Sequence, residues 1–460
     1  MLNRKIILGA LLLGAVVLVA TVPSAAVPSS ADGPELGKEL TAMGAIQAGN
    51  GSGSTAGTIP PWTGGYNAIP NGWKPGDHYV DPFASDKPLY KIDHSNYQKY
   101  SQYLSAGQMA MFERYPDTWF MNVYPSRRSA CYPEDIYKAS LENAQTASLT
   151  ADGNGVKDCR RTSPFPIPES GLEVLWNHML RYRGEVMSRT IGQVAPAPNG
   201  KFVMVRIEEQ VLWRYNREGM TSADSDNVLA KFYQGVLSPP RLAGTKLHVH
   251  ETLDQGQDPR QAWVYSAGLR RVRRAPQVAF DNPGTASDGQ RTNDQFDMFN
   301  GSPERYDWKL IGRQEMIVPY NCYKSHNAEA DPDQLIRAGH LNPDLLRYEH
   351  HRVWKVEATI KSGTSHLYAK RVMHFDEDSW QPLVVDQYDN SGKIWRVSEA
   401  YPIVYYDIPI LYDSLLAHYD LQNGRYLAIG FNAPGKVERF DVTLRDKDFS
   451  PAALSRRGRR

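Results

Sequence analysis

The sequence predicts an α+β fold, mainly antiparallel β, and three observations support this. Residues 201–401 form a long succession of amphipathic segments, each roughly seven to twelve residues long, separated by turn-forming residues. Aromatic residues are 11% of the chain, with 26 Tyr and 10 Trp, and such side chains favour strands. No cluster of residues identifies a reaction, so a large antiparallel sheet is favoured over a catalytic α/β core.

The chain begins with a pattern typical of a secretory signal peptide. Arg4 and Lys5 precede an apolar run, residues 6–22, and small side chains up to Ala26 suit a signal peptidase. We therefore expect residues 1–26 to be removed. The alternative is a membrane anchor, but a run of about seventeen residues is at the short end of the spanning range.

The remaining chain is close to electrically neutral. The formal net charge is +1, and loss of the two cations of the signal peptide, with no acid, changes it to −1. Such a chain has no bulk electrostatic reason to bind nucleic acid, which is excluded as a partner. No second stretch is apolar and long enough to span a membrane, so we expect a soluble mature protein.

Residues 27–90 are predicted to form an extended N-terminal arm. Residues 35–48 have the composition of a short helix, residues 49–57 are rich in Gly and Ser, and the prolines that follow prevent a helix. Because such a segment cannot build its own core, Trp62 and Trp73 favour docking across the main domain over a disordered leader.

Residues 91–445 are expected to form one β domain with helical insertions. Apolar spacing and proline breaks predict helices at residues 94–115, 133–149, 169–183 and 408–419. Alternation and turn signals predict strands at residues 202–213, 246–253, 261–269, 308–318, 352–360, 366–375, 382–389, 394–397, 425–431 and 437–444. The basic C-terminal tail spans residues 446–460, and its end, residues 455–460, has four Arg and is expected to fray.

Three cysteines remain in a chain that we expect to enter an oxidising compartment. Cys131 and Cys159 flank a polar, Gly-containing loop, and a disulfide between them would close it at a gain of about 3 kcal/mol. Cys322 would then be single. Three cysteines allow three pairings, so the other two stay open.

Two blocks of sequence resemble a known family. Residues 40–45 (LTAMGA) with residues 58–65 (TIPPWTGG), and then residues 263–276 (WVYSAGLRRVRRAP), are similar to the domain of unknown function 1329. That family is grouped with LolA and LolB, so the resemblance implies a LolA-like incomplete β-barrel with a helical lid. Residues 374–393 also resemble a hairpin of LolA-like carriers.

The resemblance also implies a place of action and partners. Members of the family are secreted proteins of Gram-negative bacteria, which implies a periplasmic protein. In LolA-like proteins the concave sheet holds acyl chains, which implies a lipid or another lipophilic small molecule as ligand. Family members are associated with an inner-membrane transporter of the resistance-nodulation-division type and an outer-membrane protein, and both are expected partners here.

Candidate ligand-binding residues follow from strand positions near an expected concave face. Alternation places Arg271 and Arg273 on one face of a strand end, where the guanidinium fork suits a carboxylate or a lipid head group. The alternative is a solvated, ion-paired hairpin. The full set of candidates is Trp263, Tyr265, Arg271, Arg273, Trp354 and Val356.

Two other groups of polar residues are predicted to have no catalytic or metal-binding role. His248 and His250 share a strand face within reach of one metal ion, but structural histidines are favoured because no helical metal motif is present. Asp376, Glu377 and Asp378 contain the carboxylates of a glycosidase, but three consecutive acids favour a solvated turn. With no nucleophile elbow and no phosphate loop, the chain is predicted to have no catalytic residue, no metal and no cofactor.

These observations favour a periplasmic carrier or chaperone for a lipophilic ligand, not an enzyme. Two alternatives remain. A secreted enzyme could act on carbohydrate or another polymer with the aromatic residues as stacking platforms, and a structural adaptor could serve an outer-membrane complex.

Overall fold

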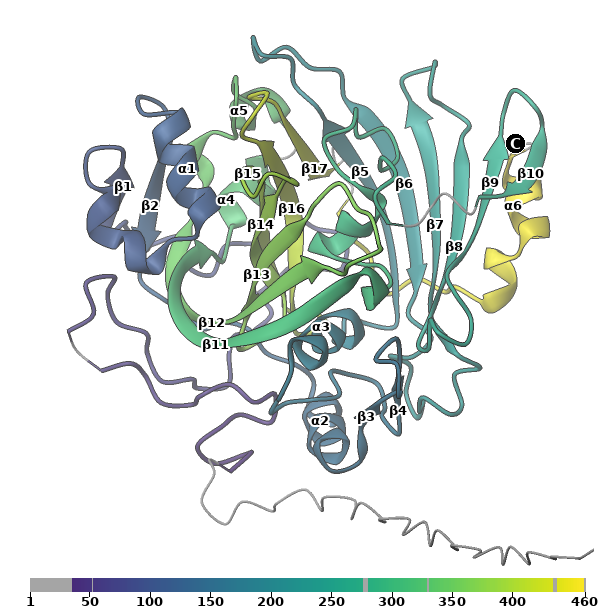
Figure 1. The fold of residues 1–460 in the computed structure, drawn as a ribbon, viewed down its shortest axis with the longest axis horizontal. Coiled ribbons are helices and arrows are strands. Elements are labelled where there is room, and N and C mark those ends of the chain that lie inside the picture. The colour runs from purple at the N-terminus through teal and green to yellow at the C-terminus, as the bar shows by residue number, and fades with distance from the viewer. Residues whose placement is uncertain (1–34, 52, 276–279, 329–330, 433–436, 459–460) are drawn as a thin grey trace, which may run out of the picture. The chain divides into compact units, whose positions relative to one another are not determined.

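A computed structural model describes residues 35–460 except 52, 276–279, 329–330, 433–436 and 459–460 (Figure 1). The predicted signal peptide, residues 1–26, lies outside the described residues. None of the helices in the described ranges combines the length and the apolar character needed to cross a bilayer.

One large sheet dominates the fold, and its strands are antiparallel except for the parallel pair β2 and β12. Its strand order is β1 (Tyr90–Asp93), β2 (Phe120–Tyr124), β12 (Tyr348–Ile360), β13 (Lys370–Asp376), β14 (Pro382–Tyr388), β15 (Ile394–Tyr405), β16 (Ile410–Asp420), β17 (Tyr426–Asn432), β5 (Val186–Val194), β6 (Val205–Leu212), β7 (Val228–Ser238), β8 (Lys246–Thr252), β9 (Gln261–Ser266) and β10 (Arg271–Arg274), with β11 (Tyr306–Pro319) paired to β12. Within the described chain the end strands β1 and β10 do not pair with each other, so the sheet is an incomplete barrel, as predicted.

The helices are short and lie between or beside the strands. They are η1 (Tyr97–Tyr103), α1 (Ala106–Arg114), α2 (Glu134–Thr146), α3 (Gly171–Leu180), η2 (Asn293–Met298), η3 (Pro303–Arg305), α4 (Tyr323–Ala328), α5 (Pro332–Leu335), η4 (Pro343–Leu345), η5 (Asp446–Phe449) and α6 (Pro451–Gly458), where η marks a 3₁₀ helix. A separate small hairpin contains β3 (Ser148–Leu149) and β4 (Val156–Lys157).

Local signals explain where these helices begin. Ser105 and Gln108 form a capping box at the start of α1, and Ser170 caps α3 by accepting a hydrogen bond from the backbone N–H of Glu173. The predicted helix at residues 94–115 is therefore split into η1 and α1, whereas α2 and α3 lie within the predicted ranges.

The strand register assigns each side chain to one of two faces, because residues paired across a ladder point to the same side. We call one side the cavity face; it carries Val356, Met373, Val385, Ser398, His418, Leu427, Ile429, Gln193, Arg189, Glu209, Gln234, Leu247 and Val264. The opposite side, the outer face, carries Asp386, Val397, Tyr233, His248, Trp263 and Tyr265.

Helices cover parts of both faces. On the cavity face, the ring of His178 from α3 lies 5.9 Å from the ring of Phe375, and Gln295 from η2 bonds to Ser398. On the outer face, Ser105 at the start of α1 donates a hydrogen bond to Asp386 at 2.8 Å. The middle of the sheet is therefore buried on both sides.

This double burial explains one wrong prediction. Residues 408–419 were expected to form a helix, but the segment is strand β16 between β15 and β17. Every residue of β16 is buried, so its sequence lacks the alternation of apolar and polar residues that marks a half-exposed strand. Without that alternation, the sequence pattern does not distinguish a buried strand from a helix.

Two further predicted elements are absent from the described chain. Residues 35–48 contain turns and isolated bridges, such as Leu40 with Ile46, in place of a helix. Residues 437–444 make a single bridge from Arg439 to Ser188 in place of a strand.

The C-terminal tail is ordered, contrary to expectation. Residues 446–458 form η5 and α6, and the fully buried Phe449 and Leu454 pack with Tyr233 and Tyr265 on the outer face of β7 and β9. The fraying predicted for residues 455–460 is wrong for residues 455–458, which belong to α6, because the apolar side chains before them pack on the sheet.

Candidate functional site

The candidate ligand site is a cavity on the cavity face of β6, β7 and β8. It has a volume of about 70 Å³, and its floor includes Val211, Phe232, Leu247 and Val249. The register explains this floor, because Phe232 pairs with both Val211 and Val249 and all three point to one side. The site is thus lined by apolar side chains from adjacent strands.

The segment around η2 closes this cavity. Phe296 lies over the floor, with its ring 5.2 Å from that of Phe232. Its neighbour Asp297 is buried and binds Arg181 at 2.8 Å and Arg183 at 2.5 Å. These two guanidinium groups hold the pKa of Asp297 well below its usual range despite burial. The ion pairs therefore fix the backbone that carries Phe296.

The lining of the cavity also includes polar side chains. Glu251 on β8 binds Arg260 at 2.8 Å and accepts a hydrogen bond from Asn300 at 3.1 Å. All three residues line the cavity. An apolar floor with a few fixed polar groups is the usual composition of a site for an amphiphilic small molecule.

A second, smaller cavity of about 20 Å³ lies next to the first. Gln234, Arg291, Phe296 and Tyr412 line both cavities, so these side chains separate them. Arg291 is 6% exposed, and burial lowers its pKa to about 10.

Two of the predicted ligand-binding residues are on the wrong face for this cavity. Trp263 and Tyr265 point to the outer face, where they pack with the cluster that contains Leu454. Tyr265 is covered so closely that a Cβ on Gly458 of α6 would lie 2.5 Å from its ring. The tail therefore covers the aromatic surface that was predicted to be free.

The other candidates lie away from the cavity as well. Val356 is on the cavity face but is fully buried in the main core, and Trp354 is 7% exposed, stacked on Trp380 and under the guanidinium of Arg313. Arg271 and Arg273 are exposed on the edge strand β10. The structure thus brings none of the six into the lining of this cavity, and sequence reasoning missed Phe232, Phe296 and Arg291.

The two histidines on β8 contact the C-terminal segment and have a structural role. His248 is buried 5.8 Å from the ring of Phe449, and burial lowers its pKa to about 3. His250 shares a hydrogen bond of 2.9 Å with the carbonyl of Phe449. Both side chains hold the C-terminal segment against the sheet.

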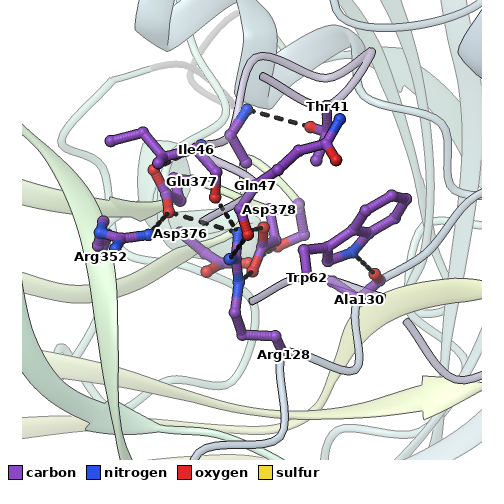
Figure 2. A network of polar contacts seen from close by, with 12 residues as sticks. Thr41, Ile46, Gln47, Trp62, Arg128, Ala130, Arg352, Asp376, Glu377 and Asp378 are labelled. Atoms are coloured by element: carbon purple, nitrogen blue, oxygen red, sulfur yellow. Dashed lines mark hydrogen bonds and ion pairs between the residues drawn. The ribbon is translucent and has the colours of Figure 1, made fainter. Parts of the chain in front are cut away.

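The three consecutive acids after β13 form a buried ion-pair network, shown in Figure 2. Asp376, Glu377 and Asp378 are 0%, 1% and 5% exposed, so the prediction of a solvated turn is wrong. Arg128 binds both oxygens of Asp378 at 2.7 and 3.0 Å, and Arg352 lies 3.3 Å from Glu377. Arginines far away in the sequence neutralise charges that the local sequence suggested were exposed.

This network also holds the N-terminal arm. Arg128 donates hydrogen bonds to the carbonyls of Ile46 and Gln47 (Figure 2). It also donates one to the carbonyl of Pro60, and Arg352 donates one to that of Ala48. Trp62 in the same arm donates its indole N–H to the carbonyl of Ala130 at 3.2 Å. The arm is thus tied to the sheet through one guanidinium in particular.

Asp376 differs from its neighbours. Burial, together with the nearby charge of Asp378, raises the pKa of Asp376 to about 7. One of its oxygens accepts hydrogen bonds from Tyr320 and Ser379, and the other has no partner in the described structure. The neutral form of this buried carboxyl group is favoured because no cation pairs with it among the described residues.

Ligand atoms of His351, Asp376 and Asp378 lie within 4.8 Å of one another, close enough to hold a metal ion. However, Arg128 already binds both oxygens of Asp378, and the ring of His351 lies 3.0 Å from Glu349. Because Asp378 and His351 already have protein partners, we interpret the cluster as a structural clamp on the arm.

The predicted disulfide is absent. All three cysteines belong to the described chain and are buried free thiols. Cys131 lies beside the arm and donates to the carbonyl of Tyr66 at 3.0 Å, whereas Cys159 lies beside Ser222 and Tyr215. Cys131 and Cys159 each pack against different residues. Their positions on either side of one loop in the sequence therefore do not bring the two thiols together in the fold.

The fold and the site define an open antiparallel sheet with a closed, mainly apolar cavity on one face. The chain belongs to the family described as "Protein of unknown function (DUF1329)", whose sequence profile matches residues 91–455. The predicted family is therefore confirmed, although the block at residues 40–65 precedes the matched region.

Known proteins share this sequence and fold to different extents. The chain is 45% identical, over 425 residues, to the uncharacterized protein PA3922 of Pseudomonas aeruginosa, with 92% of each chain covered. A DUF1329 family protein from Desulfovibrio piger is similar in structure, with a TM-score of 0.40, 17% identity and coverage of 59% and 92%. The LolA superfamily protein NE2245 from Nitrosomonas europaea has a TM-score of 0.37, 14% identity and coverage of 62% and 98%.

Proposed function

We propose that this protein is a periplasmic carrier that holds a lipophilic ligand in the cavity on β6, β7 and β8. The observation that supports this most is the continuous apolar floor of Phe232, Leu247 and Val249, closed by Phe296. Burial of an acyl chain there would gain roughly 25 cal/mol for each Å² of apolar area removed from water. Binding would need no chemical step.

The cavity is too small for such a ligand as it stands. Its volume of about 70 Å³ is well below the roughly 300–1,000 Å³ of ordinary ligand pockets. Phe296 is one of the four side chains between it and the second cavity, so movement of its ring would enlarge the site toward that cavity. We therefore propose that Phe296 leaves its place when the ligand enters.

Two substitutions test this in opposite directions, with the neutral dye N-phenyl-1-naphthylamine as the probe. Val249→Trp should fill the floor and abolish binding of the dye. Phe296→Ala should join the cavities and tighten binding by at least about fivefold, since the ring no longer has to be displaced. The matched control is Leu237→Trp on the same sheet, where the side chain is 51% exposed.

The readout is dye fluorescence in a titration, with circular dichroism to confirm that each variant is folded. Equal binding by the wild type, Val249→Trp and Leu237→Trp would place the dye elsewhere on the protein and refute the cavity as the site. Absence of binding by both the wild type and Phe296→Ala would remove the basis for a carrier.

The place and partners of the carrier are part of the proposal. The signal peptide pattern and the Gram-negative family support a periplasmic location. Transfer between a transporter of the resistance-nodulation-division type and an outer-membrane protein is supported by the family resemblance alone. An enzyme acting on polymers is less favoured, because the acids Asp376, Glu377 and Asp378 are buried and paired.

A further inference from the structure

Three arginines line the main cavity, and they differ in their partners. Arg183 pairs with Asp297 at 2.5 Å, and Arg260 pairs with Glu251 at 2.8 Å. Arg291 has no acid within 4 Å and no hydrogen-bond partner for its side chain among the described residues, and its Nε is fully buried. It is the unpaired cation of this cavity.

The acids nearest to Arg291 are already engaged. Glu209 binds Arg189 at 2.8 Å and accepts a hydrogen bond from Gln234 at 2.8 Å. Asp294 binds Arg371 at 2.7 Å and lies 3.1 Å from His366. Neither carboxylate is available to neutralise Arg291 without leaving another cation unpaired.

The guanidinium is also held in place. A Cβ on Gly284 would lie 2.8 Å from one terminal nitrogen of Arg291, so the group packs directly on the glycine backbone. At 6% exposure, an unpaired arginine is costly, because its charge loses hydration without gaining a partner. An anionic ligand would supply the partner that the described residues do not.

We infer that Arg291 receives an anionic head group, a carboxylate or a phosphate, at the end of a ligand whose alkyl chain fills the cavity. The guanidinium lines both cavities, so a chain on the floor and a head group at Arg291 are continuous. The planar fork of arginine suits either oxyanion. This inference rests on the proposed carrier function and specifies the class of ligand.

The test compares two probes that differ only in the head group, hexadecanoic acid and 1-hexadecanol, each displacing the neutral dye at pH 8. The wild type should bind the acid at least about tenfold more tightly than the alcohol, as expected for one charge-assisted contact. Arg291→Met should lose this preference by weakening the acid only. Arg439→Met, an exposed arginine of the same chain, should keep it.

Each outcome separates the inference from the carrier function. If the wild type binds both probes equally, or if Arg291→Met keeps the preference, the assignment of Arg291 is wrong while the carrier function stands. If neither probe displaces the dye, both fail. A second arm with hexadecyl phosphate and with phosphatidylglycerol vesicles identifies whether a free acid or a phospholipid is the source of the anion.

The thermal stability of Arg291→Met distinguishes a ligand-binding role of Arg291 from a structural one. Because Arg291 has no partner to lose among the described residues, Arg291→Met should keep or raise the thermal midpoint in the absence of ligand. A marked fall in the midpoint would show that Arg291 serves the fold, and it would overturn the inference.

Discussion

Arg128→Met is the most informative perturbation of this fold, because one guanidinium holds both the acidic turn and the N-terminal arm. The change leaves Asp378, 2% exposed at its side chain, without its cation, and it leaves three arm carbonyls without their donor. Removal of one partner of a buried pair costs about 3–5 kcal/mol. We therefore expect the free energy of unfolding to fall by roughly 4 kcal/mol.

The assay is urea denaturation followed by tryptophan fluorescence, together with hydrogen exchange of residues 40–62. Arg439→Met is the control, because its ion pair with Asp441 is exposed and should contribute less than about 1 kcal/mol. The double variant Arg128→Met with Asp378→Asn should recover about 1–3 kcal/mol, since the stranded charge is gone. Equal losses for Arg128→Met and Arg439→Met, or strictly additive losses in the double variant, would refute the clamp.

Three further predictions concern protonation, the tail and the thiols. The pKa of Asp376 is raised to about 7 in the folded state, so its contribution to stability is complete below its ordinary pKa of 3.8 and is lost as pH rises through 7. The difference in free energy of unfolding between the wild type and Asp376→Asn should therefore decrease from pH 4 to pH 7, by up to about 1.4 kcal/mol per pH unit. A difference that does not change with pH would contradict this prediction. Deletion of residues 446–460 removes Phe449 and Leu454 and exposes Tyr233 and Tyr265. The free energy of unfolding should fall by about 3 kcal/mol, and binding of a hydrophobic dye should increase. An unchanged melting temperature would contradict this prediction. Burial raises the pKa of Cys131 to about 12 and that of Cys159 to about 11. A maleimide should therefore label no thiol in the native protein and three thiols in urea without reductant. If only one thiol is labelled in urea, the other two are joined in a disulfide.

The sequence predicts what depends on local pattern. Strand β6 alternates because one of its faces is more exposed than the other, and its range and that of β8 were correct to within a few residues. β16 was missed because both of its faces are buried, which removes the alternation. Local pattern does not record how many layers cover a strand.

The site depends on contacts between distant segments, which the sequence does not display. Asp376 and its neighbours were assigned to solvent because nothing nearby in the chain reveals that Arg128 and Arg352 converge on them. Arg291 is one arginine in a polar loop, and only its burial without a partner among the described residues makes it notable. The face of β9 was misassigned for a similar reason, because the register and the covering tail are both properties of the folded chain.

The seam between β17 and β5 has a consequence for how the chain must assemble. β5 to β10 pair successively, as do β12 to β17, and in the described chain the two sets join through the ladder between β17 and β5 (Figure 1). Until β17 has been synthesised, β5 is an unpaired edge in the middle of the future sheet, and pairing of such distant segments is slow. An open edge accepts any matching strand. β17 of a second copy fits the β5 edge as well as the chain's own β17 does, so dilution during refolding should favour the single chain over strand-exchanged pairs.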